Sequence, residues 1–491
     1  MIIDCLEAAV LAQEPLPLFK KGDNSMSILI KNASYVVTFN DRDEIVENTN
    51  ILIEGEKILA VGPDLSLIPF AEESQIIDAR GMVVLPGLVN THHHLYQTLF
   101  RGLPEVQGMP LFSWLINLYE FWRHITPEAV YYGAMVGFSE LLRTGCTLTS
   151  DHHYVFPRGQ ASDLIDAQIT AACEIGIRFH ATRGSMSLGK SEGGLPPDEV
   201  VQDAETILRD SQRLIEKYHN SSPYAMTRLA LAPCSPFSVS LDLMRQSQIL
   251  AREKGVMLHT HLAETLDEET FCLERYGRRP VELMEDVGWI GEDVWFAHAI
   301  HLNKREIDLL ARSGSGVAHC PSSNMKLGSG ICPTSDLVKA GVKLGIAVDG
   351  SASNDGSNMW EEVRRAYLLN HLRYKDQGLS AYETLKCATR GGADVLGRPD
   401  TGRLEAGKAA DIILINLKDV AYAGCHDPLV SIVCCGNQSL VDTTIVNGKV
   451  VVRNGQLLTL DTEKIRKSAH QVACELVKKE RGLKKLHNEN Q

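Results

Sequence analysis

Apolar and polar positions follow two different patterns along this chain, and the change from one pattern to the other divides it. From residue 27 to about residue 77, short runs of alternating apolar and polar residues are separated by turn residues, as in ILIKNASYVVT and NTNILIEGEKILAVG. A very similar texture returns near the other end, in ADIILINL and DTTIVNGKVVVRNGQLL. Alternation with period two predicts short strands joined by turns. We therefore predict one composite β domain built from both flanks, which pair in space.

The central part of the chain repeats a different unit. Helical stretches such as PEAVYYGAMVGFSELLRTG and LDLMRQSQILAREKG are followed by short apolar runs that end in polar residues, such as CTLTSDHH and VMLHTHLAE. Repeated strand and helix units of this kind are typical of an α/β fold with a parallel (β/α)8 barrel. We expect four parts. Residues 1–25 form an N-terminal extension, residues 26–84 and 398–460 form the composite β domain, and residues 85–397 form the barrel. Residues 461–491 form a surface helix to about residue 481 and a polar tail.

Composition and charge narrow the class of function. The 491 residues suit one barrel, which commonly takes about 250 residues, and a second, smaller domain. The formal net charge of -13 argues against nucleic acid or an anionic membrane as the main partner, since both need a positive surface. No apolar run approaches the roughly 20 residues of a membrane span, and Asp4 and Glu7 stand where a signal peptide carries Lys or Arg. The 12 cysteines include no CxxC pair and are interpreted as reduced thiols of a cytoplasmic protein.

The candidate chemistry begins in residues 83–97, VVLPGLVNTHHHLYQ, an apolar run that ends in three histidines. A buried barrel strand presents metal ligands in this way at its C-terminal end. Alternate residues of a strand point the same way, so His92 and His94 face one direction and His93 faces the other, where we expect a structural role. Further polar residues end or follow the other apolar runs: Asp151, His152, His153, Arg183, Cys234, Ser235, His259, His261, Glu264, His298, His319 and Asp349.

Some of these residues fit a hydrolytic metal site. His92, His94, His261 and Asp349 supply three imidazoles and one carboxylate, a donor set suited to a divalent metal that keeps an open position for water. Such a metal makes water a nucleophile at neutral pH. Glu264 lies three residues after His261, where it would carry the proton of that water to the substrate. His298 ends the next strand and would hold the water or polarise the developing charge.

Several residues have two interpretations. His259 shares a face with His261 but lies one barrel layer deeper, which favours support of a ligand or layer packing over ligation. His319 either orders its loop or contacts the substrate. Residues 151–153 either line the pocket or cap a helix. The Cys234 thiol is interpreted as a buried small residue, since no base is assigned to it.

Six motifs occur in this order: PGLVNTHHHLYQ, HTHLAET, FAHAIHL, VAHCPSSN, VDGSASN and GRLEAGKAADIIL. Together they resemble the amidohydrolase superfamily, and specifically its chlorohydrolase and deaminase branch, over residues 27–456. The resemblance implies a distorted (β/α)8 barrel with a β-sandwich domain made from both chain ends. It also implies metal ligation by His92, His94, His261 and Asp349, proton transfer by Glu264, acceptance of the nucleophile's proton by Asp349, and a catalytic role for the strand-six residue His298.

Two details of the sequence refine what the resemblance implies. Binuclear relatives bridge two metals with a carboxylated lysine after strand four, but LALAPCSPFS contains no lysine. This implies one divalent metal, zinc or iron. The stretches TRGSMSLGKSEGGLPP, LAPCSPFS and HTHLAETLDEETFCLERYGRRPVE are most similar to those of bacterial 8-oxoguanine deaminases, which implies hydrolysis of 8-oxoguanine to urate and ammonia.

Three further residues are candidate substrate contacts. Gln97 aligns with a substrate amide contact of purine deaminases, and its paired donor and acceptor suit a purine edge. Arg183 ends strand three, where it would bind the 8-oxo carbonyl, and Trp114 would stack on the base. The structural alternatives are a hydrogen bond within a loop for Gln97, a surface ion pair for Arg183 and a packing contact of the ring for Trp114.

Other functions stay open at this point. The hydroxyatrazine-type ethylaminohydrolases share the metal motifs, as do deaminases of guanine and pterins and dehalogenases of triazines. A non-catalytic scaffold is disfavoured because all four ligands, Glu264 and His298 are present. The expected partners are a small heterocyclic substrate and further copies of the chain, since barrels of this family are often dimers or larger.

Overall fold

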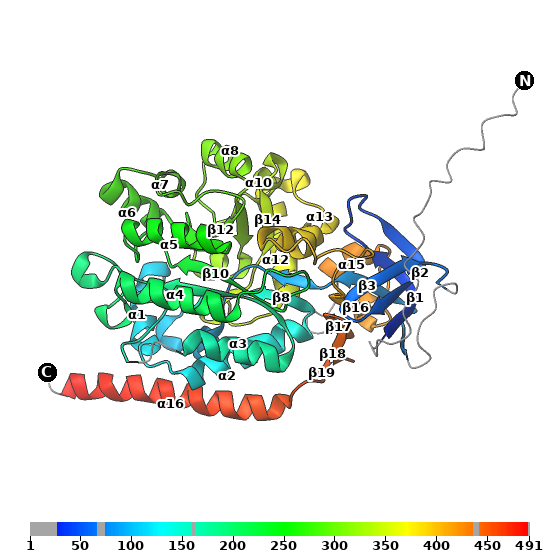
Figure 1. Ribbon diagram of the computed structural model, residues 1–491, viewed down its shortest axis with the longest axis horizontal. Coiled ribbons are helices and arrows are strands. Elements are labelled where there is room, and N and C mark those ends of the chain that lie inside the picture. Colours follow the sequence, from blue (N-terminus) through cyan, green and yellow to red (C-terminus); the bar gives the residue numbers. More distant parts are fainter. Residues whose placement is uncertain (1–26, 66–73, 160–162, 436–440, 490–491) are drawn as a thin grey trace, which may run out of the picture.

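The computed structural model describes residues 27–65, 74–159, 163–435 and 441–489. The expected N-terminal extension lies outside these residues. Figure 1 shows a barrel with a ring of helices around it on the left and a sheet, in blue and orange, on the right. The chain therefore has the predicted α/β class, a barrel with an additional sheet domain.

Eight parallel strands close the barrel in sequence order. They are β6 (Leu88–Asn90), β8 (Cys146–Ser150), β9 (Arg178–Ser185), β10 (Thr227–Pro233), β11 (Met257–Leu262), β12 (Val294–His298), β13 (Gly316–His319) and β14 (Lys343–Ile346). Most of their residues are buried on both faces, which is why these strands appear in the sequence as continuous apolar runs.

Helices surround the barrel and cover its strands (Figure 1). The larger ones are α1 (Leu111–Trp122), α2 (Pro127–Arg143), α3 (Leu164–Ile175), α4 (Ala204–Tyr218), α5 (Leu241–Lys254), α6 (Leu266–Tyr276), α7 (Pro280–Asp286), α8 (Lys304–Ser313), α10 (Thr334–Ala340), α12 (Met359–Tyr374), α13 (Ala381–Lys386) and α15 (Pro428–Cys434). Local sequence fixes many of their ends. For α5, the Ser240 side chain accepts a hydrogen bond from the Leu243 N–H, and the helix stops at Gly255 with φ +66°.

The sheet domain joins the two flanks of the chain. Its strands are β1 (Ser27–Val37), β2 (Ile45–Glu54), β3 (Lys57–Gly62), β4 (Gln75–Asp78), β5 (Met82–Pro86), β16 (Ile412–Asn416), β17 (Thr443–Val446), β18 (Lys449–Arg453) and β19 (Gln456–Leu457). β5 pairs in parallel with β1 and antiparallel with β16, so the predicted pairing of the flanks is confirmed. The strands form one mixed nine-stranded sheet with its own hydrophobic cluster, where the sequence had suggested an antiparallel unit.

The segment of residues 83–97 differs from the single strand that its apolar pattern predicts. It contains β5, which belongs to the sheet domain, and β6, which is the first barrel strand. Gly87 lies between the two strands. A larger residue does not fit there, because its Cβ atom would lie 2.0 Å from Oγ1 of Thr147. The last strand of the first flank thus ends at Pro86, close to the predicted domain limit at residue 84, and the first barrel strand begins at Leu88.

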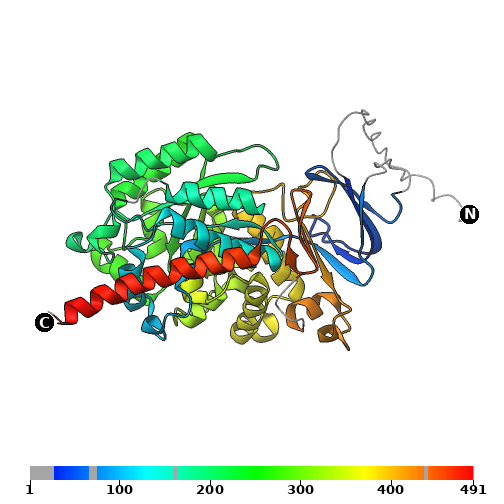
Figure 2. The same ribbon diagram turned by 90° about the horizontal axis from the view of Figure 1, so that it is seen from below.

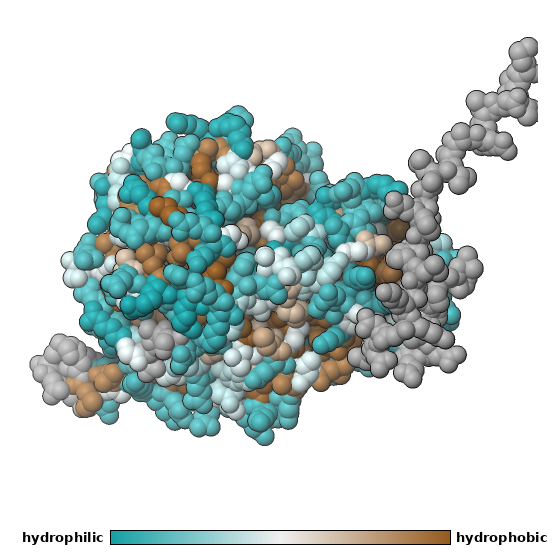
Figure 3. Space-filling model, in the orientation of Figure 1, coloured by the Kyte–Doolittle hydropathy of each residue, from teal (hydrophilic) through white to brown (hydrophobic). Residues whose placement is uncertain are grey.

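The C-terminal helix α16 (Thr462–Glu489) continues beyond the predicted end near residue 481. It lies along α2 (Figures 1 and 2). Glu480 of this helix is buried, and it accepts hydrogen bonds from Arg123 Nη2 at 3.1 Å and His124 Nε2 at 3.0 Å. Leu483 and Leu486 are exposed near its free end, where Figure 3 shows apolar surface. Within the described ranges, no helix is long and apolar enough to cross a membrane.

A buried ion pair fastens the barrel to the sheet domain. Arg178, the first residue of β9, contacts Asp411 through Nε and Oδ2 at 2.8 Å and through Nη2 and Oδ1 at 2.9 Å. Their side chains are 0% and 2% exposed. Removal of one partner leaves the other charge buried and unpaired.

Asp411→Ala is therefore expected to lower the free energy of unfolding by about 3–5 kcal/mol, measured by urea denaturation. Glu463→Ala, which breaks the exposed pair between Glu463 and Arg466, is the control, and it should leave the free energy of unfolding nearly unchanged. Equal losses in the two variants would contradict the importance of burial for the Asp411 pair.

Candidate metal centre

Two short strands beyond the barrel bring the predicted ligands together. β7 (His93–His94) continues the path of β6, and β15 (Asp349–Gly350) follows β14. The two pair in parallel, and the Asp349 N–H donates to the His92 carbonyl at 3.1 Å. Asp349 from the end of the barrel is therefore placed beside the histidines from its beginning.

The four predicted metal ligands converge within the barrel. Asp349 Oδ1 lies 3.3 Å from His92 Nε2 and 3.1 Å from His94 Nε2. His94 Nε2 lies 3.2 Å from His261 Nε2. All four residues are buried. Four ligands about 2.0–2.1 Å from one tetrahedral ion would lie about 3.3–3.4 Å apart, so this donor set fits a divalent metal.

Backbone carbonyl groups orient two of the imidazoles. His94 Nδ1 lies 2.7 Å from the His152 carbonyl oxygen, and His261 Nδ1 lies 2.7 Å from that of Cys234. A carbonyl oxygen can only accept, so both Nδ1 atoms carry the proton. The Nε2 lone pairs of His94 and His261 consequently face the centre of the cluster, as a metal requires.

His259 orients the third imidazole. Its Nδ1 donates to the Trp295 carbonyl at 2.9 Å, so its Nε2 is an acceptor and receives the Nδ1 proton of His92 at 2.7 Å. The His259 ring also stacks on Trp295 with centroids 4.4 Å apart. His259 thus both supports a ligand and packs in a barrel layer, the two roles its sequence position suggested.

Burial keeps the imidazoles neutral, which is the state that binds a metal. Desolvation, with help from the neighbouring His94, lowers the pKa of His261 to about 3. Desolvation likewise holds the pKa of His92 well below its ordinary value. At neutral pH no proton competes with a metal for these two nitrogens.

Glu264 and His298, the predicted acid–base residues, lie beside the donor atoms. Glu264 Oε2 lies 3.4 Å from His298 Nε2, and Asp349 Oδ2 lies 3.8 Å from the same nitrogen. The His298 Nδ1 proton is donated to Asn324 Oδ1 at 2.9 Å. Burial opposes a charged imidazole, but the carboxylates of Glu264 and Asp349 raise the pKa of His298 above its ordinary value. Burial also raises the pKa of Glu264, which favours proton uptake by this carboxylate.

A cavity of about 30 Å³ opens onto these groups. This volume holds one or two water molecules. Its apolar lining includes Leu111 and Leu115 of α1, together with Phe237 and Leu327. Glu264, His298 and Asp349 therefore line a small buried space, in which electrostatic interactions are stronger than in bulk water.

Two of the three predicted substrate contacts line this cavity. Gln97, in the short helix η1 (Leu95–Phe100), has both amide atoms buried without a hydrogen-bond partner among the described residues. Gly350 leaves room for it, because a Cβ there would lie 1.9 Å from Gln97 Oε1. Trp114 is 3% exposed, and its Nε1 also lacks a partner in the described part of the chain. Its ring packs against Trp122 at 5.6 Å, so the packing alternative holds as well.

The structure does not bring Arg183 to the cavity. Its Nε contacts Asp210 Oδ2 at 2.7 Å, its Nη2 contacts Gln202 Oε1 at 2.8 Å, and its Nη1 donates to the Gly184 carbonyl. Arg183 is not the last residue of β9, which continues to Ser185. Alternation along the strand turns it toward α4 and away from the barrel interior. Arg183 is thus a buried ion-pair residue, which corrects its predicted place at the substrate.

Residues 151–153 have roles that the sequence had left open. Asp151 accepts hydrogen bonds from the Leu95 N–H at 2.7 Å and from Gln168 Nε2 at 2.9 Å. Asp151 therefore caps η1 directly after the metal-binding segment, and burial raises the pKa of its carboxyl to about 6. His152 stacks on His261 with centroids 4.6 Å apart.

His152, for which the sequence suggested pocket lining or helix capping, lies instead among the possible metal donors. One of its ring nitrogens lies within 4.8 Å of donor atoms of His92, His94 and His261. Its Nε2 contacts the Ala232 carbonyl at 2.8 Å. The signal in the sequence was the run of polar residues at the end of strand two, in TSDHH.

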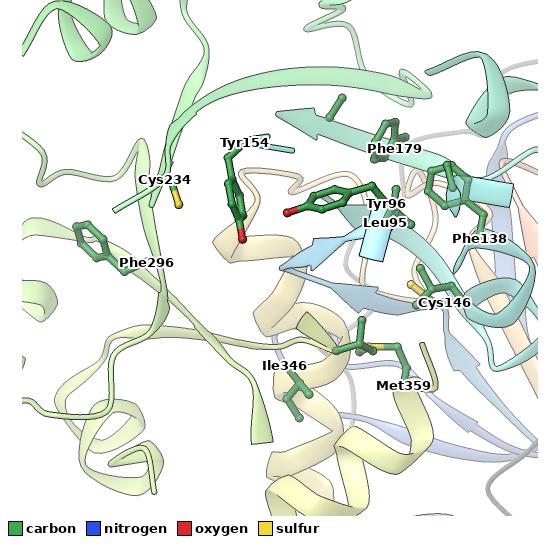
Figure 4. Close-up of a cluster of buried hydrophobic side chains, with 14 of the residues drawn as sticks. Leu95, Tyr96, Phe138, Cys146, Tyr154, Phe179, Cys234, Phe296, Ile346 and Met359 are labelled. Carbon is green, nitrogen blue, oxygen red and sulfur yellow. The ribbon is translucent and has the colours of Figure 1, made fainter. Parts of the chain in front are cut away.

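The remaining candidates stand outside the chemistry. His93 Nε2 contacts Ser357 Oγ at 3.0 Å, and its Nδ1 accepts the His94 N–H at 2.8 Å, which is the expected structural role. His319 is buried but does not line the cavity. Cys234 lines the cavity, and burial raises the pKa of its thiol to about 12, so it stays protonated at neutral pH. Figure 4 shows Tyr154 between Cys234 and Tyr96.

Comparisons with known proteins agree with this site. The sequence profile of the amidohydrolase family matches residues 83–451. The chain is 51% identical over 384 residues to 8-oxoguanine deaminase of Pseudomonas aeruginosa, covering 78% of this chain and 85% of the relative. It is 37% identical to hydroxydechloroatrazine ethylaminohydrolase of Pseudomonas sp. strain ADP, covering 88% and 92%. Among solved structures, atrazine chlorohydrolase from Arthrobacter aurescens TC1 complexed with zinc has a TM-score of 0.87 and 38% identity, covering 91% of this chain and 100% of that chain.

Proposed function

The chain belongs to the amidohydrolase family, and from this premise we propose that it is a metal-dependent aminohydrolase that converts 8-oxoguanine and water to urate and ammonia. The observation that carries the proposal is the cluster of three imidazole Nε2 atoms and Asp349, set beside Glu264 at the wall of a buried cavity. The choice of 8-oxoguanine is supported by the 51% identity to the Pseudomonas aeruginosa enzyme.

The residues present would hold one divalent metal, for which we propose zinc. The Nε2 atoms of His92, His94 and His261 and the Asp349 carboxylate are its ligands. When bound, the metal lowers the pKa of water to about 7 and so supplies a nucleophile at neutral pH.

Side chains of the protein accept and donate the protons of the reaction. Asp349 accepts the proton that water loses as the new C–O bond forms at the amino-bearing carbon C2. Glu264 takes the other proton of the water and delivers it to the adjacent ring nitrogen. Asp349 then passes its proton to the amino group, which leaves as ammonia when the C–N bond breaks. His298, held by Asn324 and facing both carboxylates, stabilises the negative charge that develops at the site.

Gln97 and Trp114 are proposed to recognise the heterocycle. Their buried amide and indole N–H groups have no hydrogen-bond partner within the described residues. Buried polar groups are costly when unpaired. A purine edge, which presents donors and acceptors side by side, would satisfy both residues and align the ring with Glu264.

A second candidate substrate class is the hydroxylated triazines. The relative from Pseudomonas sp. strain ADP is an ethylaminohydrolase that matches 88% of this chain, and the zinc-complexed structural neighbour is an atrazine chlorohydrolase. A triazine carbon attacked by water needs the same proton transfer to a ring nitrogen. The motif set alone therefore does not separate the two classes.

Steady-state kinetics on four compounds separates them. We expect kcat/KM for 8-oxoguanine to exceed the values for guanine, isoxanthopterin and hydroxyatrazine by at least about tenfold, because one mismatched polar contact in a buried pocket costs this much or more. Release of ammonia, and of ethylamine from hydroxyatrazine, is measured with the zinc-loaded enzyme. A higher kcat/KM on any of the other three compounds would reject the proposed substrate.

A further inference from the structure

A fully buried carboxylate, that of Glu268, lies behind the proton-carrying residue. Glu268 is in the first turn of α6 and is 0% exposed. Its Oε1 accepts the Ala263 N–H at 2.8 Å, and its Oε2 accepts the Glu264 N–H at 2.9 Å. We propose that Glu268 is a positioning residue that fixes the backbone of Glu264 so that its carboxylate meets the reacting atoms. This inference rests on the proposed function only in giving Glu264 the proton transfer.

The backbone that Glu268 holds has an unfavourable conformation. Ala263 has φ +52°, in the left-handed region that residues with a Cβ rarely adopt. Such a conformation costs about 1–3 kcal/mol and persists only where surrounding contacts hold it. The Ala263 carbonyl accepts hydrogen bonds from the N–H groups of Ile300 at 2.9 Å and His301 at 3.0 Å. The turn between β11 and α6 is thus held by Glu268 on its N–H side and by the loop after β12 on its carbonyl side.

Ordinary helix capping does not explain these contacts. The N-cap of α6 is Thr265, whose Oγ1 accepts the Glu268 N–H at 3.3 Å. In a capping box, the glutamate at the third helical position binds the N-cap N–H, as Glu306 does with Asn303 at 2.8 Å in α8. Glu268 occupies the same helical position but reaches further back, to the two residues that end with Glu264.

The contacts of Glu264 show why its backbone position matters. Its side chain faces His298 Nε2 at 3.4 Å on one oxygen and Ser329 Oγ at 3.4 Å on the other. Proton transfer depends steeply on distance, and a displacement of about 1 Å can cost about 100-fold in rate. A turn freed from Glu268 would therefore slow the chemical step without removing any group that binds the substrate or the metal.

The test uses Glu268→Gln in the zinc-loaded, full-length enzyme, assayed on whichever of the four compounds it hydrolyses best. The amide keeps the size of the side chain, but its NH2 group opposes one of the two N–H donors. We expect kcat to fall about 10- to 100-fold, with KM within about twofold and an unchanged zinc content. In the Glu264→Gln background, the same substitution should lower kcat by less than about threefold further, because residues that act through one group are not additive.

Glu383→Gln is the control. It replaces the glutamate at the same helical position of α13, where the carboxylate accepts the N–H of its own N-cap residue Ser380 at 2.7 Å, so its kcat should stay within about twofold of the wild type. If Glu268→Gln gives too little folded protein, Glu268→Asp is used in its place. This variant retains the charge but has a shorter side chain, and its kcat, KM and zinc content are compared in the same way.

The outcomes separate this inference from the proposed function. If Glu264→Gln itself left kcat unchanged, the proton transfer assigned to Glu264 would be wrong. If Glu264→Gln were nearly inactive but Glu268→Gln either left kcat unchanged, raised KM instead, or acted with its full effect in the Glu264→Gln background, only the positioning role of Glu268 would be overturned.

Discussion

Glu264→Gln is expected to lower kcat/KM by about 10³- to 10⁴-fold while the enzyme keeps its metal. The glutamine retains the size of the side chain but cannot take up and deliver a proton, and general acid–base catalysis by one group contributes up to about 10⁴-fold. Glu264 does not belong to the cluster of metal-donor atoms, so its replacement leaves those donors in place. Ammonia release and zinc content are measured on the same purified protein.

The control for Glu264→Gln is Glu174→Gln, since the Glu174 carboxylate is on α3 and accepts a surface hydrogen bond from the Tyr131 hydroxyl. Its kcat/KM should equal that of the wild type. Retention of most of the wild-type rate by metal-loaded Glu264→Gln enzyme would remove Glu264 from the proton path, and His298, the nearest titratable group, would then be the next residue to test.

Asp349→Asn is expected to reduce both metal binding and rate. Its Oδ1 lies next to the Nε2 atoms of His92 and His94, so the substitution removes the negative charge from the cluster of donors. We expect metal affinity to fall by more than about 100-fold, beyond the losses typical of residues that only support a ligand. Because Asp349 also accepts a proton from water, kcat/KM should remain about 10²- to 10⁴-fold low even at saturating zinc.

Zinc titration separates the two roles of Asp349. Metal content is measured after gel filtration, and activity is then followed as zinc is added back. Full recovery of kcat/KM at saturating zinc would leave Asp349 as a ligand only, and an unchanged metal content would reject its role as a ligand. Asp355→Asn is the control, since Asp355 lies six residues later and pairs with Lys326 at the surface.

The convergence of the four proposed ligands was predictable because their positions follow from local rules. Strand alternation separates His92 and His94 from His93, and the C-terminal ends of barrel strands meet at one level. His261 and Asp349 are distant in sequence, but each follows a recognisable apolar run. The same rule placed Glu264 near the cluster, where its carboxylate now lies 3.4 Å from His298 Nε2.

Strand limits were less predictable, and this is why Arg183 was misplaced. An apolar run that is buried on both faces does not show where the strand ends, nor which of its alternating side chains point into the barrel. The continuous run of residues 83–97 likewise concealed the break at Gly87, because strands of the sheet domain and of the barrel are both buried there. Only the close approach of Thr147 reveals why a glycine stands at this point.

Contacts to the backbone were beyond sequence reasoning. The orientation of His94 and His261 depends on the carbonyl groups of His152 and Cys234, which any residue type would offer equally. The capping of η1 by Asp151 joins residues 56 positions apart. In the sequence, Glu268 looks like an ordinary glutamate in the first turn of a helix, and nothing indicates that it binds the backbone of the Glu264 turn. Such contacts depend on the folded chain, and they cannot be predicted from patterns of residue types.

The position of β5 in the sheet has a consequence for how the chain is made. Its two neighbours are β1, which is synthesised before it, and β16, which is synthesised more than 300 residues later. Until the ribosome has delivered β16, one edge of β5 has unpaired N–H and C=O groups, and an open strand edge invites pairing with other chains. A nascent or truncated chain that stops before residue 412 therefore has an unpaired strand edge shortly before His92, at which we expect it to aggregate more readily than the complete chain.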